Sequence, residues 1–230
     1  IYSPLDLGAL ETALGWLVQR HSVLRTVYEL FDSEPRQHVK PRTDRVLEVI
    51  DAADWTTERR QDAAMGRYRH PFDLRNGPIF RAVLWQAGES DSTLLLVMPH
   101  LAIDGWSLWL LLDELQQCYR AAVSNEPEPW IDAPPMAYTD FVKWQADMLV
   151  SSAGESLWAY WREQLRGVPA VLDLPTDHSR PKRQTFNGGI CTAEVDPVLC
   201  ATLEGIALKE GTTLYAILLA AFQVLIYRHT

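Results

Sequence analysis

Apolar residues recur at intervals of three and four positions along several stretches of the chain, which predicts amphipathic helices. The clearest repeat runs from about residue 105 to 123, through Leu108, Leu111, Leu112, Leu115, Tyr119 and Ala122. A second repeat covers residues 5–20, and Asp54 is a possible N-cap for a helix over 54–69. Further helices are expected at 138–151, 153–165, 196–209 and 213–229.

Short apolar or alternating runs predict strands at 25–31, 36–41, 46–50, 79–85, 93–98 and 188–195. The polar connection 88–92 separates two of these runs, which indicates a hairpin or an adjacent strand pair. Strands mixed with helices of this length predict an α/β fold, a two-layer α+β sandwich in which helices pack on a sheet.

Two proline-containing segments divide the chain. The stretch 126–135 must be a loop, because its prolines exclude a regular helix or a central strand. The polar, locally basic stretch 174–183 is interpreted as a linker. We expect a first lobe over 1–173, a crossover linker over 174–187 and the start of a second lobe over 188–230. Because the chain begins at Ile1 and ends directly after a helical pattern, we expect a piece of a larger protein.

Composition and charge narrow the class of protein. With 47% hydrophobic and 22% charged residues, the chain has the composition of an ordinary globular protein. Its net charge of −9 argues against nucleic-acid binding, and no apolar stretch reaches the roughly 20 residues of a membrane span. Without a signal peptide we expect a cytoplasmic protein. The three cysteines, Cys118, Cys191 and Cys200, lack metal-ligand spacing and are expected to be buried thiols.

The most informative segment for chemistry is 98–107, where an apolar run ends and a helical pattern begins. It contains His100 and, four residues later, Asp104 and Gly105. A histidine at a strand end beside a carboxylate is a plausible general base. The alternative is a loop histidine followed by an aspartate that caps the helix. If Asp104 is instead buried, it needs a cationic partner, for which Arg25 is the candidate.

Other candidates are weaker. Ser107 lies in no nucleophile elbow, so it is not expected to be a catalytic serine. The remaining histidines lie beside turns or helix ends and are expected to be surface or capping residues: His21, His38, His70, His178 and His229. The aromatic residues of 138–165 are expected to pack in the core rather than line a ligand site: Tyr138, Phe141, Trp144, Trp158, Tyr160 and Trp161.

The block from His100 through Asp104-Gly105 to Ser107 resembles the core motif of nonribosomal peptide synthetase condensation domains, in the chloramphenicol-acetyltransferase-like superfamily. The family pattern is His-His-x-x-x-Asp-Gly. Five further blocks resemble the family in its order: Arg20–Thr26, His70–Leu74 with Gly77-Pro78, Tyr138–Gln145, Leu174–Asp177 with Arg180-Pro181, and a helix from Thr213 through Leu225. Together they extend from about residue 20 to the end of the chain.

The resemblance implies a two-lobed fold with the active site between the lobes, of which this chain supplies the first lobe and the start of the second. It implies amide-bond formation between an acyl or peptidyl thioester and an aminoacyl thioester. Both substrates would be held on phosphopantetheine arms of carrier protein domains, beside an adenylation domain. The domain itself would bind no cofactor or metal. The natural-product pathway would be one that assembles a peptide, such as an antibiotic.

The same resemblance assigns residue roles. His100 would accept or position the proton of the attacking amine, or stabilise the tetrahedral intermediate. Asp104 would hold the loop through an ion pair with Arg25, and the Gly105 N–H would be an oxyanion donor. The departure is Pro99, which stands where the family usually has its first histidine. Pro99 keeps open the alternative of a noncatalytic docking or recruitment module. A coenzyme A-dependent acyltransferase of the same superfamily is a third alternative.

Overall fold

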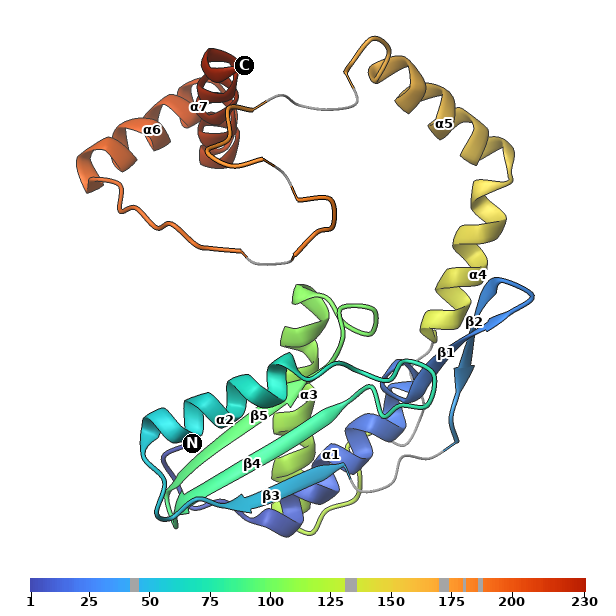
Figure 1. Cartoon of the computed structure of the whole chain (residues 1–230), viewed down its shortest axis with the longest axis vertical. Coiled ribbons are helices and arrows are strands. Elements are labelled where there is room, and N and C mark those ends of the chain that lie inside the picture. The colour runs from blue at the N-terminus through green and yellow to red at the C-terminus, as the bar shows by residue number, and fades with distance from the viewer. Residues whose placement is uncertain (42–45, 131–135, 170–173, 180, 186–187) are drawn as a thin grey trace. The chain divides into compact units, whose positions relative to one another are not determined.

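The chain divides into two units, Ile1–Glu155 and Ser156–Thr230. The computed structural model (Figure 1) describes residues 1–41, 46–130, 136–169, 174–179, 181–185 and 188–230. The predicted lobe boundaries lie beside or within segments that include undescribed residues, among them Arg180 of the crossover block. The predicted boundaries at 173 and 187 therefore stay predictions.

The first unit is built on a three-stranded sheet of order β3-β4-β5. β4 (Arg81–Gly88) and β5 (Asp91–Val97) form the predicted antiparallel hairpin, and β3 (Leu47–Asp51) runs parallel to β4. Helix α2 (Thr57–Arg69) makes the connection from β3 to β4. A parallel pair requires such a crossover, because the chain must return to the same end of the sheet.

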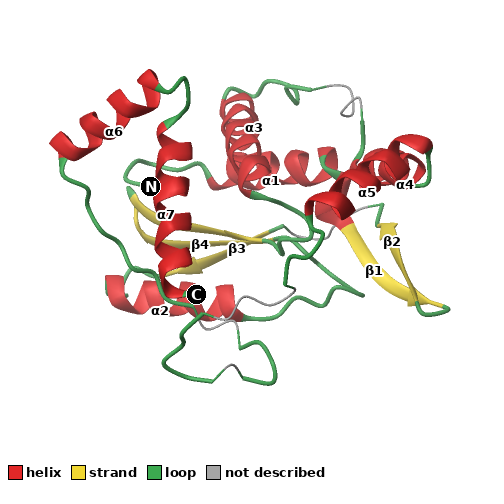
Figure 2. Cartoon of the chain, turned by 90° about the horizontal axis from the view of Figure 1, so that it is seen from above, coloured by secondary structure: helices red, strands yellow, loops and turns green. Residues whose placement is uncertain are grey.

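Helices cover both faces of this sheet (Figure 2). Alternate side chains of a strand point to opposite faces. Ala82 and Leu84 of β4 join the cluster beneath α1 (Leu7–Arg20) and α3 (Gly105–Val123), whereas Val83 and Trp85 pack with residues of α2. Coverage on both faces explains why β4 reads as a continuous apolar run. The predicted layered α/β architecture is confirmed.

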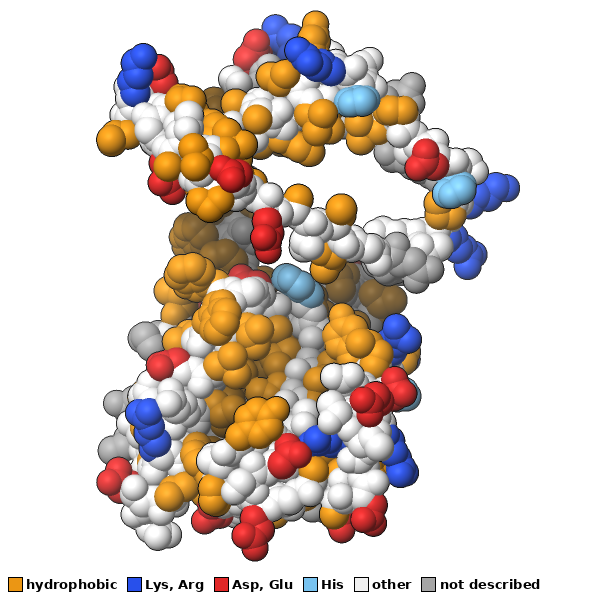
Figure 3. All heavy atoms as spheres, turned by 90° about the vertical axis from the view of Figure 1, so that its left-hand side faces the viewer, with side chains coloured by type: hydrophobic (Ala, Val, Ile, Leu, Met, Phe, Trp, Pro, Cys, Tyr) orange, Lys and Arg blue, Asp and Glu red, His pale blue; other side chains and the backbone are white. Residues whose placement is uncertain are grey.

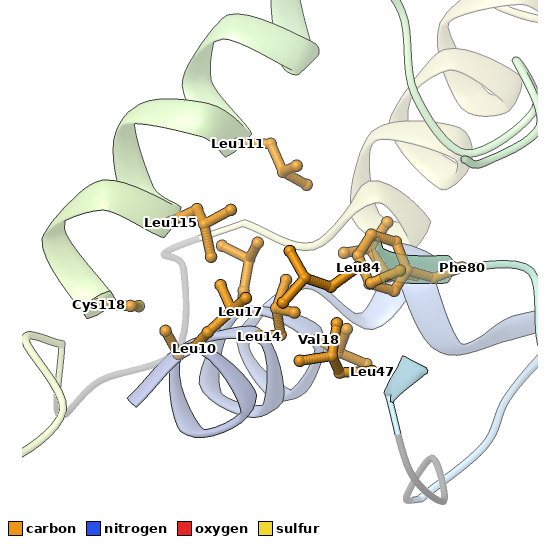
Figure 4. Packing of buried hydrophobic residues seen from close by; sticks show 13 residues of the cluster. Leu10, Leu14, Leu17, Val18, Leu47, Phe80, Leu84, Leu111, Leu115 and Cys118 are labelled. Atoms are coloured by element: carbon orange, nitrogen blue, oxygen red, sulfur yellow. The ribbon is translucent and has the colours of Figure 1, made fainter. Parts of the chain in front are cut away.

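The main core lies between α1, α3 and the sheet (Figure 4). The three-to-four spacing of α1 buries one face of the helix: Ala9, Leu10, Ala13, Leu14, Leu17 and Val18. These side chains meet Leu111, Leu115 and Cys118 of α3. Full burial of a leucine contributes about 1.5–3 kcal/mol, so this interface is a major source of stability for the first unit.

A separate two-stranded ribbon precedes the sheet. β1 (Thr26–Phe31) and β2 (Glu34–Val39) pair antiparallel through a tight turn in which Asp32 and Ser33 both have positive φ, 51° and 67°. A two-residue turn of this kind matches the right-handed twist of paired strands. The ribbon is buried at its base and exposed toward its tip. A short 3-10 helix, η1 (Ser22–Arg25), connects α1 to β1.

The remaining helices are α4 (Tyr138–Leu149), α5 (Ser152–Gln164), α6 (Pro197–Lys209) and α7 (Leu214–His229), close to their predicted positions. Within the described residues no single helix is long and apolar enough to cross a membrane. Among the described helices, α6 and α7 meet that length and composition criterion only when taken together, as a pair bent by 105°.

Three local predictions were wrong. Residues 188–195 form no strand, because no strand of the described part of the second unit is present to complete their hydrogen bonds. The N-cap of α2 is Thr56, whose Oγ1 accepts from the Arg59 N–H at 3.2 Å, and not Asp54. Among the predicted buried thiols only Cys118 is buried; Cys191 is exposed and Cys200 is half-buried.

The aromatic residues of α4 and α5 are also not core residues. All six that were expected to be buried are exposed, from 38% for Phe141 to 66% for Trp158. Three of them form a row of contacting rings on α4. The ring centres of Tyr138 and Phe141 are 6.0 Å apart, and those of Phe141 and Trp144 are 5.6 Å apart. Helical spacing identified a common face but did not determine whether that face is covered.

Candidate active site

A cavity of about 410 Å³ lies in the first unit where the end of α1, the loop after β5 and the first turns of α3 meet. Its walls are mostly apolar, including Leu24, Ile103 and Leu111, which is typical of ligand sites. Its polar side chains are His21, His100, Asp104, Ser107 and Tyr138. The two residues that the sequence singled out, His100 and Asp104, are therefore brought to one cavity.

The loop that presents His100 begins where β5 leaves the sheet. Pairing with β4 ends at Val97, so Pro99 lies beyond the ladder, where no N–H is required. The carbonyl of Pro99 accepts from the Ala102 N–H at 2.8 Å, and Ala102 is buried. This turn leaves His100 exposed at the cavity, and its ring makes no hydrogen bond within the described residues.

Asp104 is the N-cap of α3, one of the two roles that the sequence left open. Its carboxylate accepts from the Ser107 N–H at 2.8 Å and from the Ser107 hydroxyl at 2.6 Å. These hydrogen bonds, led by the hydroxyl, hold the pKa of Asp104 below its ordinary value. The Ser107 hydroxyl therefore contributes to the cap of α3, and among the described residues no histidine forms a hydrogen bond with it.

The predicted ion pair between Arg25 and Asp104 is not formed. The Arg25 guanidinium donates instead to the carbonyls of Val18 and Gln19, each at 3.0 Å, and to the carbonyl of Lys40. Val18 and Gln19 belong to the last turn of α1, where carbonyls lack helical partners and attract cations. Arg25 therefore closes the end of α1, while Asp104 is exposed and needs no cationic partner.

Gly105 is the first residue of α3, so its N–H has no acceptor within the helix. Its φ is not positive, and a Cβ placed on it would meet nothing within 4 Å. The backbone at this position does not require a glycine, and open space remains above it. That space is compatible with the oxyanion role, which stays a prediction.

A buried ionic cluster beside the cavity was missed by sequence reasoning. Glu114 of α3 is 7% exposed; its Oε1 lies 3.5 Å from Nε of Arg20, and its Oε2 contacts Nε2 of His21. The guanidinium of Arg20 lies 4.5 Å from the ring centre of Trp130. His21 is therefore not a surface histidine, but it is a capping residue, the other role predicted for it: as the C-cap of α1 its N–H donates to the Leu17 carbonyl at 3.1 Å. A charged residue within the apolar stripe formed by Leu111 and its neighbours was the available signal.

The other histidines, His38, His70, His178 and His229, are exposed, as predicted, and none lines this cavity. Within the described ranges, no group of three or more histidine, cysteine, aspartate or glutamate residues could hold a metal ion. On the face of the first unit seen in Figure 3, hydrophobic side chains gather in the middle and acidic ones at the edges.

The family profile of the condensation domain matches residues 1–230. A protein of the linear gramicidin synthase of Brevibacillus parabrevis is 39% identical over 230 residues, which are 98% of this chain and 4% of that protein. Phosphinothricin tripeptide synthetase PhsC of Streptomyces viridochromogenes is 34% identical over 229 residues, 98% of this chain and 21% of that protein. The chain thus corresponds to a small part of these relatives.

Solved structures establish the fold. The X-domain from teicoplanin biosynthesis superposes with a TM-score of 0.91 at 23% identity, over 99% of this chain and 50% of that one. The epimerization domain from the third module of tyrocidine synthetase B has a TM-score of 0.68 at 23% identity, over 77% of this chain and 40% of that one. The predicted chloramphenicol-acetyltransferase-like fold is confirmed. The chain therefore belongs to the condensation domain family of nonribosomal peptide synthetases.

Proposed function

We propose that this chain is part of a catalytic condensation domain that joins two carrier-bound substrates through an amide bond. The observation that supports the proposal is the cavity of about 410 Å³ in which His100 lies beside the Asp104 cap of α3. The substrates are an acyl or peptidyl thioester and an aminoacyl thioester, each on the phosphopantetheine arm of a carrier domain. The partners are these carriers and an adjacent adenylation domain.

The chemistry is an exchange of a thioester for an amide. The amine nitrogen of the acceptor attacks the donor carbonyl carbon, so a C–N bond forms and the C–S bond breaks. The amine loses one proton and the departing sulfur gains one, which leaves a thiol on the donor carrier. His100 either handles the amine proton or stabilises the tetrahedral intermediate, and the Gly105 N–H donates to the oxyanion.

The structure of the loop supports this role for a single motif histidine. Asp104 organises the first turn of α3 through Ser107 without help from residue 99. Pro99 likewise contributes its carbonyl to the turn that carries His100. Replacing a histidine by proline at position 99 removes one polar side chain but leaves the turn and the helix cap in place.

A recruitment module is the second candidate, and Pro99 is the observation that favours it. The X-domain of teicoplanin biosynthesis, which shares this fold, has been solved in a complex with OxyB. By analogy of fold alone, a condensation-like domain without its first motif histidine would bind a partner enzyme rather than catalyse condensation. A coenzyme A-dependent acyltransferase is a third alternative from the same superfamily.

One assay separates the three functions. The complete protein that contains this chain is supplied with a donor and an acceptor carrier, both loaded, and with free acyl-coenzyme A as a competing donor. Carrier-bound amide product supports the condensation domain, and turnover of acyl-coenzyme A supports the acyltransferase. Binding of a partner enzyme without turnover of either donor supports recruitment. We expect His100→Ala to lower kcat by about 10²–10⁴-fold. The matched variant His70→Ala, at an exposed residue outside the cavity, should leave kcat unchanged.

A further inference from the structure

The cavity contains a second histidine, and its ring is held more firmly than that of His100. His21 follows the last residue of α1 and lines the cavity with a side chain that is 21% exposed. Its Nε2 contacts the Glu114 carboxylate, whose side chain is only 9% exposed. The other ring nitrogen, Nδ1, makes no hydrogen bond within the described residues and is not one of the buried unpaired atoms. Among the described residues, Nδ1 is therefore left without a protein partner on a side chain that lines the cavity.

A base is effective when a third group fixes its ring and tautomer. A carboxylate that accepts from one imidazole nitrogen places the proton there and leaves the lone pair on the other nitrogen. Glu114 stands in this relation to His21. The nearest motif carboxylate, Asp104, does not do the same for His100: its Oδ1 accepts from Ser107 at 2.6 and 2.8 Å, and no hydrogen bond joins the Asp104 and His100 side chains in the described structure.

The position of Glu114 connects this pair to the cavity wall. Glu114 lies one helical turn beyond Leu111 on the buried face of α3, and Leu111 lines the cavity. A buried carboxylate requires a charged or hydrogen-bonded partner, and Glu114 has one on each oxygen: Arg20 lies 3.5 Å from Oε1, and His21 contacts Oε2. The contact to His21 therefore satisfies the carboxylate and at the same time orients a ring that lines the cavity.

We propose that His21 is a catalytic residue of this cavity and Glu114 its positioning residue; the inference rests on the proposed condensation function. Nδ1 of His21 accepts a hydrogen bond from the acceptor amine and takes its proton as the C–N bond forms. The C–S bond then breaks, and His21 returns the proton to the departing sulfur as a thiol. His100 faces the oxygen of the tetrahedral intermediate and stabilises its charge.

The test is a set of variants in the complete protein, assayed with loaded carriers. In His21→Gln the side-chain amide still donates to Glu114 but offers no ring nitrogen to the cavity. We expect kcat to fall at least about tenfold, with KM for both carriers and the thermal midpoint unchanged. His21→Ala should regain activity on addition of imidazole. The control His38→Gln changes an exposed histidine of β2 and should leave kcat unchanged.

A double substitution tests the role of Glu114. If Glu114 acts through His21, Glu114→Gln lowers kcat in the wild-type background but adds nothing to His21→Gln. Wild-type kcat in His21→Gln would overturn the inference, and so would a lack of imidazole rescue of His21→Ala. The proposed function would still stand in either case if His100→Ala is inactive. Absence of any carrier-bound product from the unmodified protein would overturn both.

Discussion

Substitution of Leu14 by alanine measures how much of the first unit depends on the contact between α1 and α3. Leu14 is fully buried, with 0% of its surface exposed, in the cluster that also contains Leu111 and Leu115. The change removes about three methylene-sized groups, which corresponds to about 2.4 kcal/mol of lost burial at 0.8 kcal/mol each. The cavity that remains adds to this loss, so we expect about 3–4 kcal/mol in total.

The assay is urea denaturation followed by far-ultraviolet circular dichroism. With a slope of about 2 kcal/mol per molar urea, the expected loss lowers the midpoint by about 1.5–2 M while the slope stays unchanged. The matched control is Leu149→Ala, which makes the same chemical change on α4 at a side chain that is 60% exposed, and should cost less than about 0.5 kcal/mol. Equal midpoints for the two variants would refute the assignment of the core to this interface.

Four further predictions concern the α3 cap and the thiols. Asp104→Ala should lower condensation activity, whereas Asp104→Ser, whose side chain can still cap α3, should retain most of that activity. The control is Asp196→Ala, which removes the corresponding N-cap of α6. Because the pKa of Asp104 is lowered, its stabilising effect should be complete above about pH 3.8 and lost as pH falls through the lower folded-state pKa. Ser107→Ala should raise that pKa in a carboxyl NMR titration. Iodoacetamide should label exposed Cys191 quickly and Cys118, whose pKa burial raises to about 11, only after unfolding; equal rates would contradict this.

The two histidines of the cavity depend on different parts of the surrounding structure. His100 is carried by a turn and an N-cap that involve only residues 99–107. His21 depends on α3 being docked against α1, because its partner Glu114 is 93 residues away in sequence. A core substitution such as Leu14→Ala should therefore affect the His21–Glu114 contact more than the His100 loop.

The amino-acid sequence by itself determined the elements whose signals are local. The repeat of apolar residues predicted α1 and α3, and the polar connection at 88–92 predicted the β4–β5 hairpin. The Asp104 cap was also readable, because a cap is completed by the N–H and hydroxyl of Ser107 three residues later. The family blocks identified the fold and gave a role to His100, which the local pattern had already singled out.

Only the tertiary structure decided which side chains meet across long separations. In the folded chain the Arg25 guanidinium donates to carbonyls at the end of α1 rather than to Asp104, and Glu114 contacts His21. The tertiary structure left 188–195 without a partner strand among the described residues and the aromatic face of α4 exposed. The physical reason is that periodicity identifies a face, whereas burial and ion pairing depend on which other element packs against it.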